Sequence, residues 1–382
     1  MTLSRRTTLL GLGAFGLSAC ATGGTLGPRA STTSGGLPAD LRPVSNAAYD
    51  AWVAGFRSRA LARGISPGTL SSAFRGTGYL PGVVKRDRNQ TEFSRTLEDY
   101  LAIAASDERV SKGRAAFARH RSTLAAVEER YGVDAEIVTA VWGLESFYGE
   151  RRGDVPVISA TSTLAFDGRR GVFFEKQLIA ALKILQSGDT TPAMLKGSWA
   201  GAMGHTQFIP TSYQAFAVDF NGDGRRDIWS DNPADSLAST AAYLARNGWT
   251  KGRKWGGEIG NGAPQGRMLQ PQAGGPRFNV TSNFNVIKRY NNSDSYAIGV
   301  GHLADRIAGG GPIRASFPPD KYGLTKDDRV RLQQRLTARG FDTGGSDGVI
   351  GPNSRKAISA YQSSIGQQPT GDPSANLLRS LG

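Results

Sequence analysis

The sequence predicts a mainly α-helical protein with two folded units, a large one over residues 46–308 and a small one over 324–382. In both units apolar residues recur at intervals of three and four, which is the period of a helix packed on one face. A segment rich in glycine and proline, 309–323, separates the two periodic regions and predicts a linker. The chain has 382 residues, enough for two domains, and its charged fraction of 20% is typical of a globular protein.

The first twenty residues are expected to be an export signal that does not join the fold. Arg5 and Arg6 precede an apolar run at 9–17, which is too short to span about 30 Å of hydrocarbon, since that takes about 20 residues. The sequence that follows, LSAC, resembles a lipobox and makes Cys20 the predicted lipidation site. Ordinary cleavage after Ala21 is the alternative. The paired arginines resemble a twin-arginine signal, with general export as the other route.

Residues 21–45 are predicted to be a flexible tether between this anchor and the folded body. They are rich in Gly, Ser, Thr and Pro, and such a segment cannot bury enough apolar surface to order itself. A lipid anchor, a tether and a folded body would suit a protein that works on a fixed polymer near a membrane.

The charge of the chain favours an anionic partner that is not a nucleic acid. The formal net charge is +14, and about +12 remains once the two signal arginines are removed. Lys and Arg do not form a dense block, which fits diffuse attraction to an anionic wall polymer better than a nucleic-acid footprint. With three histidines and one cysteine, a Cys/His zinc site and a disulfide framework are both excluded.

An apolar helix expected over 134–149 carries the most informative acid of the sequence. Helical spacing places Glu145 one turn after Val141, on or beside the buried stripe. A low dielectric disfavours the carboxylate and raises its pKa, which makes a proton donor usable near neutral pH. The candidates for the apolar wall and for stacking against sugar rings are Trp142, Phe147 and Tyr148. The alternative is a partly buried glutamate paired with an arginine.

A second stretch, 198–213, reads SWAGAMGHTQFIPTSY and combines small residues with Gln207 and a proline turn. Tight backbone and a buried amide beside an acid favour a ligand cleft. His205 lies in the same stretch, but a lone histidine is more often structural than catalytic.

Taken together, several motifs resemble the membrane-bound lytic murein transglycosylase B family. They are WGLES at 142–146, GAMG and QFIPTSY within 201–213, the loop that begins at Asp219, and YNNS at 290–293. They stand in the family's order. The resemblance implies a lysozyme-like, mainly helical fold and cleavage of peptidoglycan between N-acetylmuramic acid and N-acetylglucosamine. It also implies a lipoprotein at the periplasmic face of the outer membrane, with a cell-wall synthesis complex as a further expected partner.

The same resemblance assigns roles to individual residues. Glu145 falls on the family's catalytic acid/base. The positions that line its glycan cleft are Ser198, Gln207, Tyr243, Tyr290, Asn291 and Tyr296. For each tyrosine taken alone, core packing is the alternative.

One carboxylate is enough for the implied chemistry, which requires no cofactor. Most glycosidases need two carboxylates, and no second fixed carboxylate is evident near Glu145. Glu145 would protonate the departing oxygen and then, as the carboxylate, take the proton from the muramic acid 6-hydroxyl, giving a 1,6-anhydro end. A lysozyme-type hydrolase and a catalytically inactive wall-binding scaffold are the alternatives.

The segment 219–230, DFNGDGRRDIWS, matches the start of an EF-hand loop. Oxygen-bearing side chains stand at the first, third and fifth positions, but Ser230 stands at the last, where the loop usually has a bidentate Glu. In the resembled family the loop is longer, and Asp235 falls on the closing ligand. The expected ligands of a structural calcium ion are Asp219, Asn221, Asp223, Asp235 and the backbone carbonyl of Arg225. A solvated Asp-rich turn is the alternative.

The small unit, 324–382, resembles the peptidoglycan-binding domain. It carries DGVIGP at 347–352, Tyr361 followed by Gln362, and TG at 370–371. Nothing in its residue chemistry names a ligand, so binding of the wall polymer is implied by the resemblance alone. A structural docking module is the alternative.

Overall fold

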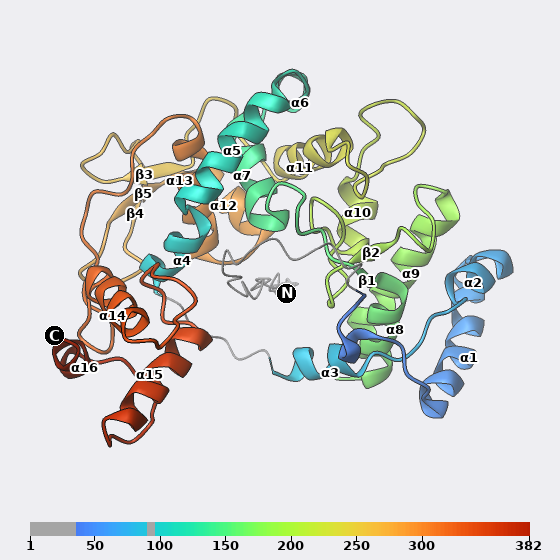
Figure 1. The fold of residues 1–382 in the computed structure, drawn as a ribbon. Helices are drawn as coiled ribbons and strands as arrows, with labels where there is room; N and C mark the ends of the chain where they lie inside the picture. The colour runs from blue at the N-terminus through green and yellow to red at the C-terminus, as the bar shows by residue number, and fades with distance from the viewer. Residues whose placement is uncertain (1–35, 90–95) are drawn as a thin grey trace, which may run out of the picture.

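The computed structural model describes residues 36–89 and 96–382, and these fold mainly into helices (Figure 1). The mainly α-helical fold class predicted from the sequence is confirmed. The expected signal peptide, with Cys20, lies outside the described residues. Within the described ranges, every helix is too short or too polar to cross a membrane.

The large unit has two groups of helices, each around its own apolar core, which lie next to each other in Figure 1. The outer lobe consists of α1 (Ala47–Ala62), α2 (Pro67–Ala73), α3 (Pro81–Arg88), α8 (Val157–Asp167), α9 (Gly171–Ser187) and α10 (Pro210–Phe216). The inner lobe consists of α4 (Leu97–Ala104), α5 (Asp107–Arg119), α6 (Arg121–Tyr131), α7 (Ala135–Ser146), α11 (Ala234–Arg246), α12 (Ser282–Tyr290) and α13 (Asp294–Ile307). Tyr243 and Tyr290 pack against both cores, so these two side chains lie where the lobes meet.

Two short antiparallel sheets complete the large unit. β1 (Val155–Pro156) pairs with β2 (Lys196–Gly197), which brings the chain that follows α7 beside the start of the 198–213 stretch. β3 (Gly256–Glu258), β5 (Phe278–Val280) and β4 (Arg267–Leu269) form a three-stranded sheet in that order.

α7 is the central helix of the inner lobe, and most of its side chains are buried. It packs against α5, α11 and α13, as expected of a helix that is apolar nearly all round. The helix ends at Ser146, earlier than the 134–149 pattern predicts. The reason is that Phe147 (φ 53°) and Tyr148 (φ 58°) take left-handed conformations, which break the helical hydrogen-bond ladder.

The residues immediately before α1 pack on the body of the protein. Leu41, at the end of the short 3-10 helix η1 (Ala39–Leu41), is buried in the core of the outer lobe. The N–H of Val44 donates to the carbonyl of Tyr79 at 2.9 Å. Of the tether expected over 21–45, the part that the structure describes is therefore folded rather than flexible.

The small unit consists of α14 (Lys326–Ala338), α15 (Pro352–Ser364) and α16 (Ala375–Ser380). These helices enclose a separate core that includes Leu332, Ile358 and Leu377. A capping box at Thr325 and Asp328 starts α14, and Pro352 starts α15 at a position that suits proline. The unit therefore has the internal packing of a domain.

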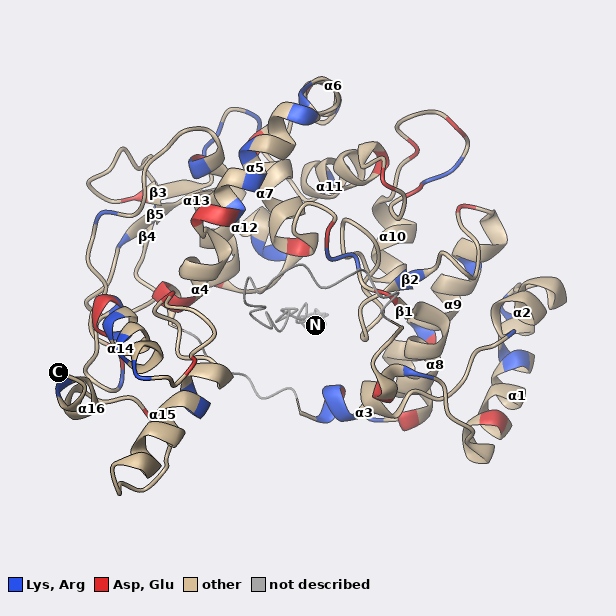
Figure 2. Cartoon of the chain, in the orientation of Figure 1, with Lys and Arg blue, Asp and Glu red and all other residues tan. Residues whose placement is uncertain are grey.

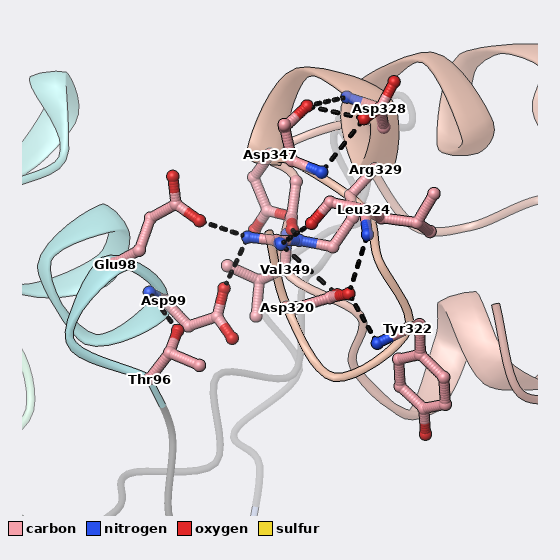
Figure 3. A network of polar contacts seen from close by, with 12 residues as sticks. Thr96, Glu98, Asp99, Asp320, Tyr322, Leu324, Asp328, Arg329, Asp347 and Val349 are labelled. Atoms are coloured by element: carbon pink, nitrogen blue, oxygen red, sulfur yellow. Dashed lines mark hydrogen bonds and ion pairs between the residues drawn. The ribbon is translucent and has the colours of Figure 1, made fainter. Parts of the chain in front are cut away.

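The small unit docks on α4 through the buried Arg329 of α14 (Figure 3). Its side chain is 2% exposed, and its guanidinium lies 2.7 Å from Glu98 and 3.0 Å from Asp99, both on α4. Asp320, in the segment expected to be a linker, lies 3.3 Å from the same guanidinium. The expected linker thus takes part in a fixed junction between the two units.

Charged residues are spread along the chain of both units rather than gathered into one block (Figure 2). Several of the basic residues are already paired, as Arg59 is with Glu175 and Arg152 with Asp231. This distribution agrees with the diffuse positive charge expected from the sequence.

Candidate active site

Glu145 lies in the last turn of α7, one residue before the helix ends. Its Oε1 accepts a hydrogen bond of 2.6 Å from the hydroxyl of Tyr296 on α13. Burial raises the pKa of Glu145 to about 7, and the Tyr296 hydrogen bond opposes this rise because it favours the charged form. A carboxyl group with this pKa populates both protonation states near neutral pH, which suits a group that gives and then takes a proton.

In the described part of the chain, Glu145 has no cationic partner. Burial raises its pKa, the Tyr296 hydrogen bond lowers it, and no cation contributes, so the described residues do not show an arginine-paired glutamate. Two neighbouring carboxylates in the sequence are engaged elsewhere. Glu150 lies 2.8 Å from Lys112, and Asp167 lies 2.5 Å from Arg88. Among the described residues, no second carboxylate is hydrogen-bonded to Glu145, which fits a one-carboxylate mechanism.

The three tyrosines expected at the cleft gather beside this acid. The rings of Tyr243 on α11 and Tyr290 on α12 are 4.8 Å apart, and Phe208 contacts them at 5.8 and 5.7 Å. Burial raises the pKa of both Tyr290 and Tyr296, and the Glu145 charge raises it further. Their hydroxyls therefore stay protonated and act as donors next to the carboxyl group.

Gln207 takes a left-handed backbone conformation, with φ 51°. Its Nε2 donates to the carbonyls of Arg152 at 3.0 Å and Gly204 at 2.8 Å. Both amide hydrogens are used within the protein, so the amide oxygen is the atom suited to accept from a ligand. Tyr290 holds the same loop, because its hydroxyl donates to the carbonyl of Thr206 at 2.6 Å. A strained residue fixed in this way is typical of a binding site.

Ser198 and Asn291 are less closely connected to the acid. The Ser198 hydroxyl accepts the backbone N–H of Ala202 at 3.1 Å and so closes the turn that follows β2. Asn291 follows α12, and its carbonyl accepts the N–H of Ser293 at 2.7 Å. Among the described residues, no hydrogen bond joins the side chain of either one to Glu145.

Asp235, at the start of α11, closes the loop expected to bind calcium. Its Oδ1 accepts the N–H groups of Phe220 and Asn221, and its Oδ2 accepts that of Asp227. Burial raises the pKa of Asp235, the three backbone hydrogen bonds oppose this rise, and the Asp219 charge adds to it.

The other oxygens of this loop accept hydrogen bonds from its own backbone. Asp219 accepts from Gly222 and Gly224, and Asp223 accepts from Arg225. Within the ranges that the structure describes, no cluster of three acidic, histidine or cysteine side chains is arranged to hold a metal ion. The donor types suit calcium, and the loop geometry is that of side-chain-capped turns.

Comparison with protein families identifies the two units. A family model described as the transglycosylase SLT domain matches residues 48–266 and 258–305. The chain belongs to the transglycosylase SLT family. A second model, for a peptidoglycan binding domain, matches residues 325–381. The two resemblances inferred from the motifs, and the lysozyme-like helical fold that they imply, are confirmed.

Individual members of the SLT family are similar over different lengths. The membrane-bound lytic murein transglycosylase B of Escherichia coli (strain K12) is 34% identical over 211 residues, which make up 47% of this chain and 58% of that relative. SltB3 from Pseudomonas aeruginosa, in complex with NAG-anhNAM-pentapeptide, is 43% identical with a TM-score of 0.69. That match covers 88% of this chain and 100% of SltB3. The Escherichia coli lytic transglycosylase Slt35, in complex with calcium, is 26% identical with a TM-score of 0.58, over 69% of this chain and 93% of Slt35.

The structure adds residues to this SLT-family site that sequence reasoning left out. Phe208 packs against two of the expected tyrosines, and the carbonyl of Thr206 accepts from the hydroxyl of one of them. Both lie in the 198–213 stretch that the sequence singled out, but nothing local shows that their partners come from α11 and α12. His205, expected to be structural, is hydrogen-bonded to Trp142 on the helix of Glu145.

Proposed function

We propose that this SLT-family chain is a lytic transglycosylase that cleaves the bond between N-acetylmuramic acid and N-acetylglucosamine in peptidoglycan. The products would carry 1,6-anhydro-N-acetylmuramic acid ends. The observation that carries the proposal is Glu145, a single half-buried carboxyl group with a pKa of about 7 that is hydrogen-bonded to Tyr296. The name of the Escherichia coli relative and the anhydro product bound to SltB3 support the same reaction.

Glu145 takes part in both steps of the proposed reaction. Protonated Glu145 gives its proton to the glycosidic oxygen, the bond from that oxygen to C1 of N-acetylmuramic acid breaks, and positive charge develops on C1. The Glu145 carboxylate then takes the proton of the 6-hydroxyl, whose oxygen forms a bond to C1. The enzyme returns to its protonated state and no water is consumed. Because the pKa lies near 7, neither step requires a strongly disfavoured protonation state.

The aromatic side chains and Gln207 would hold the glycan in place. Tyr243, Tyr290 and Phe208 present apolar ring surface of the kind that sugar rings stack on. The Gln207 amide oxygen would accept from a sugar N–H or hydroxyl. Ser198 and Asn291 would contact the strand farther from the bond that breaks.

A mass measurement of the released fragments tests the reaction. Purified peptidoglycan is digested with the wild-type protein and with Glu145→Gln, and the soluble disaccharide-peptides are weighed. We expect wild-type products lighter by one water than the hydrated reducing ends, and no products from the variant. Glu150→Gln is the matched control, because it changes an exposed carboxylate that pairs with Lys112.

Each of the other outcomes would indicate a different function for this protein. Hydrated reducing ends would contradict the transglycosylase and support a lysozyme-type hydrolase. Binding of peptidoglycan without any products, from both wild type and variant, would support a scaffold in which Glu145 is a structural acid.

We also propose that the small unit binds the wall polymer and that Cys20 carries a lipid at the periplasmic face of the outer membrane. The match of 325–381 to the peptidoglycan binding domain supports the first point, and the membrane-bound Escherichia coli relative supports the second. Labelled palmitate should enter the wild-type protein and not Cys20→Ala. Equal labelling of both would contradict a lipid on this residue.

A structural calcium ion is proposed for the loop closed by Asp235. Asp219, Asn221, Asp223 and Asp235 would supply side-chain oxygens, Arg225 would supply its carbonyl, and the ion would neutralise the repulsion between the first and last carboxylates. The structure of Slt35, which is in complex with calcium, supports a calcium ion in a protein of this fold. Calcium should raise the melting temperature of the wild type and leave that of Asp219→Ala unchanged. A wild type insensitive to calcium would contradict the proposal.

A further inference from the structure

His205 is 4% exposed, and each of its polar atoms has a partner. Nδ1 accepts from the indole N–H of Trp142 at 3.0 Å, and Nε2 lies 2.7 Å from the carbonyl of Ser230. Its backbone N–H donates to the carbonyl of Ile228 at 3.0 Å, and its carbonyl accepts the Ser146 hydroxyl at 2.8 Å. The residue therefore joins the end of α7 to the segment that leads into α11.

These contacts determine the state of the imidazole ring. An indole N–H only donates, so Nδ1 is the acceptor and the proton is on Nε2, which donates to Ser230. Arg152 lies 3.4 Å from Nε2, but it gives its hydrogens to the carbonyls of Trp229 and Ser230 at 2.8 and 3.0 Å. Burial lowers the pKa of His205 to about 4, in agreement with a neutral ring.

The two α7 residues that bind His205 lie on either side of Glu145. Trp142 is one turn before Glu145, and Ser146 follows it directly. The next two residues have left-handed backbone conformations, which persist only where the surroundings hold them. Gly149 then lies against the imidazole, since a side chain there would come within 2.3 Å of the ring. His205 thus fixes one side of a strained helix end.

We infer that His205 is a positioning residue for Glu145. As a neutral clamp on Trp142 and Ser146, it holds the last turn of α7 so that the Glu145 carboxyl faces Tyr296 and the bond to be cleaved. This inference rests on the proposed role of Glu145 as the acid and base. A displacement of a catalytic group by about 1 Å is enough to lower the rate about 100-fold. Loss of the contacts made by His205 should therefore lower kcat and leave substrate binding nearly unchanged.

Two substitutions of His205 test the hydrogen bonds of its two ring nitrogens one at a time. In His205→Asn, the shorter amide places an oxygen near the position of Nδ1, so the Trp142 bond is kept. In His205→Gln, the longer amide reaches the position of Nε2, so the Ser230 bond is kept and the indole loses its acceptor. With a soluble tetrasaccharide of alternating N-acetylglucosamine and N-acetylmuramic acid, we expect kcat of the Gln variant to fall about 10- to 100-fold. Its KM should change by less than about 3-fold, and the Asn variant should keep most of the activity.

The indole N–H resonance of Trp142, assigned with Trp142→Phe, reports on the same bond without substrate. It should move in the Gln variant and stay close to the wild-type position in the Asn variant. A wild-type kcat in both variants would overturn the inference. Equal decreases in kcat that are explained by equal decreases in melting temperature would also overturn it. An inactive wild type would count against the proposed function. In that case the indole N–H resonance of Trp142 alone would test whether His205 holds Trp142. A resonance that moves in neither variant would overturn the inference.

Discussion

Glu145 and Arg329 are both ionisable residues largely shielded from water, but their surroundings favour the neutral form of Glu145 and the charged form of Arg329. Burial lowers the pKa of Arg329, and the carboxylates of Glu98, Asp99 and Asp320 more than compensate, so the pKa ends above its ordinary value. Glu145 has a tyrosine hydroxyl and, in the described chain, no cation, so burial prevails and raises its pKa to about 7.

This difference distinguishes a structural charge from a chemical one. A guanidinium surrounded by carboxylates keeps its proton at every physiological pH, so Arg329 can only hold the two units together. A glutamate without a cation is destabilised when ionised, and this makes its proton available near neutral pH. Among the described residues, the absence of a cationic partner is therefore the feature that marks Glu145 as the candidate for proton transfer.

The largest effect on folding is expected from Arg329→Met. The substitution leaves three carboxylates without their cation at a buried junction, which should lower the free energy of unfolding by about 3–5 kcal/mol. Calorimetry should show a lower melting temperature. Arg331→Met is the matched control, because Arg331 is 57% exposed and, among the described residues, pairs with Asp328 alone, so its loss should cost less than about 1 kcal/mol. Similar small losses in both variants would mean that the network does not hold the junction.

Removing the charge of Glu145 is expected to raise the free energy of unfolding, whereas removing the charge of Arg329 lowers it. Because the pKa of Glu145 is raised in the folded state, the stability that it contributes is fully present below about pH 4.5 and is lost as the pH rises through about 7. Glu145→Gln lacks this loss, so it should be more stable than the wild type at pH 8, by about 1–3 kcal/mol, and equally stable at pH 4. Chemical denaturation at both pH values measures the difference.

The control for this effect is Glu150→Gln, which alters an exposed carboxylate of the same chain. Its stability relative to the wild type should change by less than about 1 kcal/mol at either pH. A Glu145→Gln variant that is less stable than the wild type at pH 8 would mean that the glutamate is held in its ionised form, as Arg329 holds its charge, and would remove the distinction between the two residues.

The fold was predictable where the pattern is local. Helical periodicity indicates the helices of both units, and it places Glu145 on the buried stripe of α7. Composition does not report the contacts of the segments outside the helices. The last residues of the expected tether look flexible, but Leu41 is buried, and Asp320 of the expected linker pairs with Arg329. A few contacts with residues far away in the sequence are enough to order such segments, and composition does not report them.

The sequence named Glu145 and the tyrosines that the structure brings together, but the contacts between them were not predictable. Glu145 and Tyr296 are separated by 151 positions, and their hydrogen bond depends on how α7 and α13 pack. The early end of α7 has the same origin, because the left-handed turn after Ser146 is set by tertiary contacts rather than by a glycine. The partners of His205 likewise come from α7 and from the segment before α11.

The smallest expected effect concerns the hydrogen bond that moderates the pKa of Glu145. Tyr296→Phe keeps the ring and removes the donor to Oε1, so the charged form loses a stabilising contact and the pKa should rise above about 7. If Glu145 must be protonated to begin the reaction, kcat/KM falls as the pH rises through this pKa. The alkaline limb of the profile should then move to higher pH in the variant, by less than about one pH unit, the scale of one hydrogen bond. Tyr290→Phe, which loses a bond to the Thr206 carbonyl, should leave the limb in place. A limb that moves to lower pH in Tyr296→Phe would contradict the role assigned to this hydrogen bond. It would also contradict the view that Glu145, a carboxyl group without a cation whose pKa is lowered by one neutral donor, is the catalytic acid of the molecule.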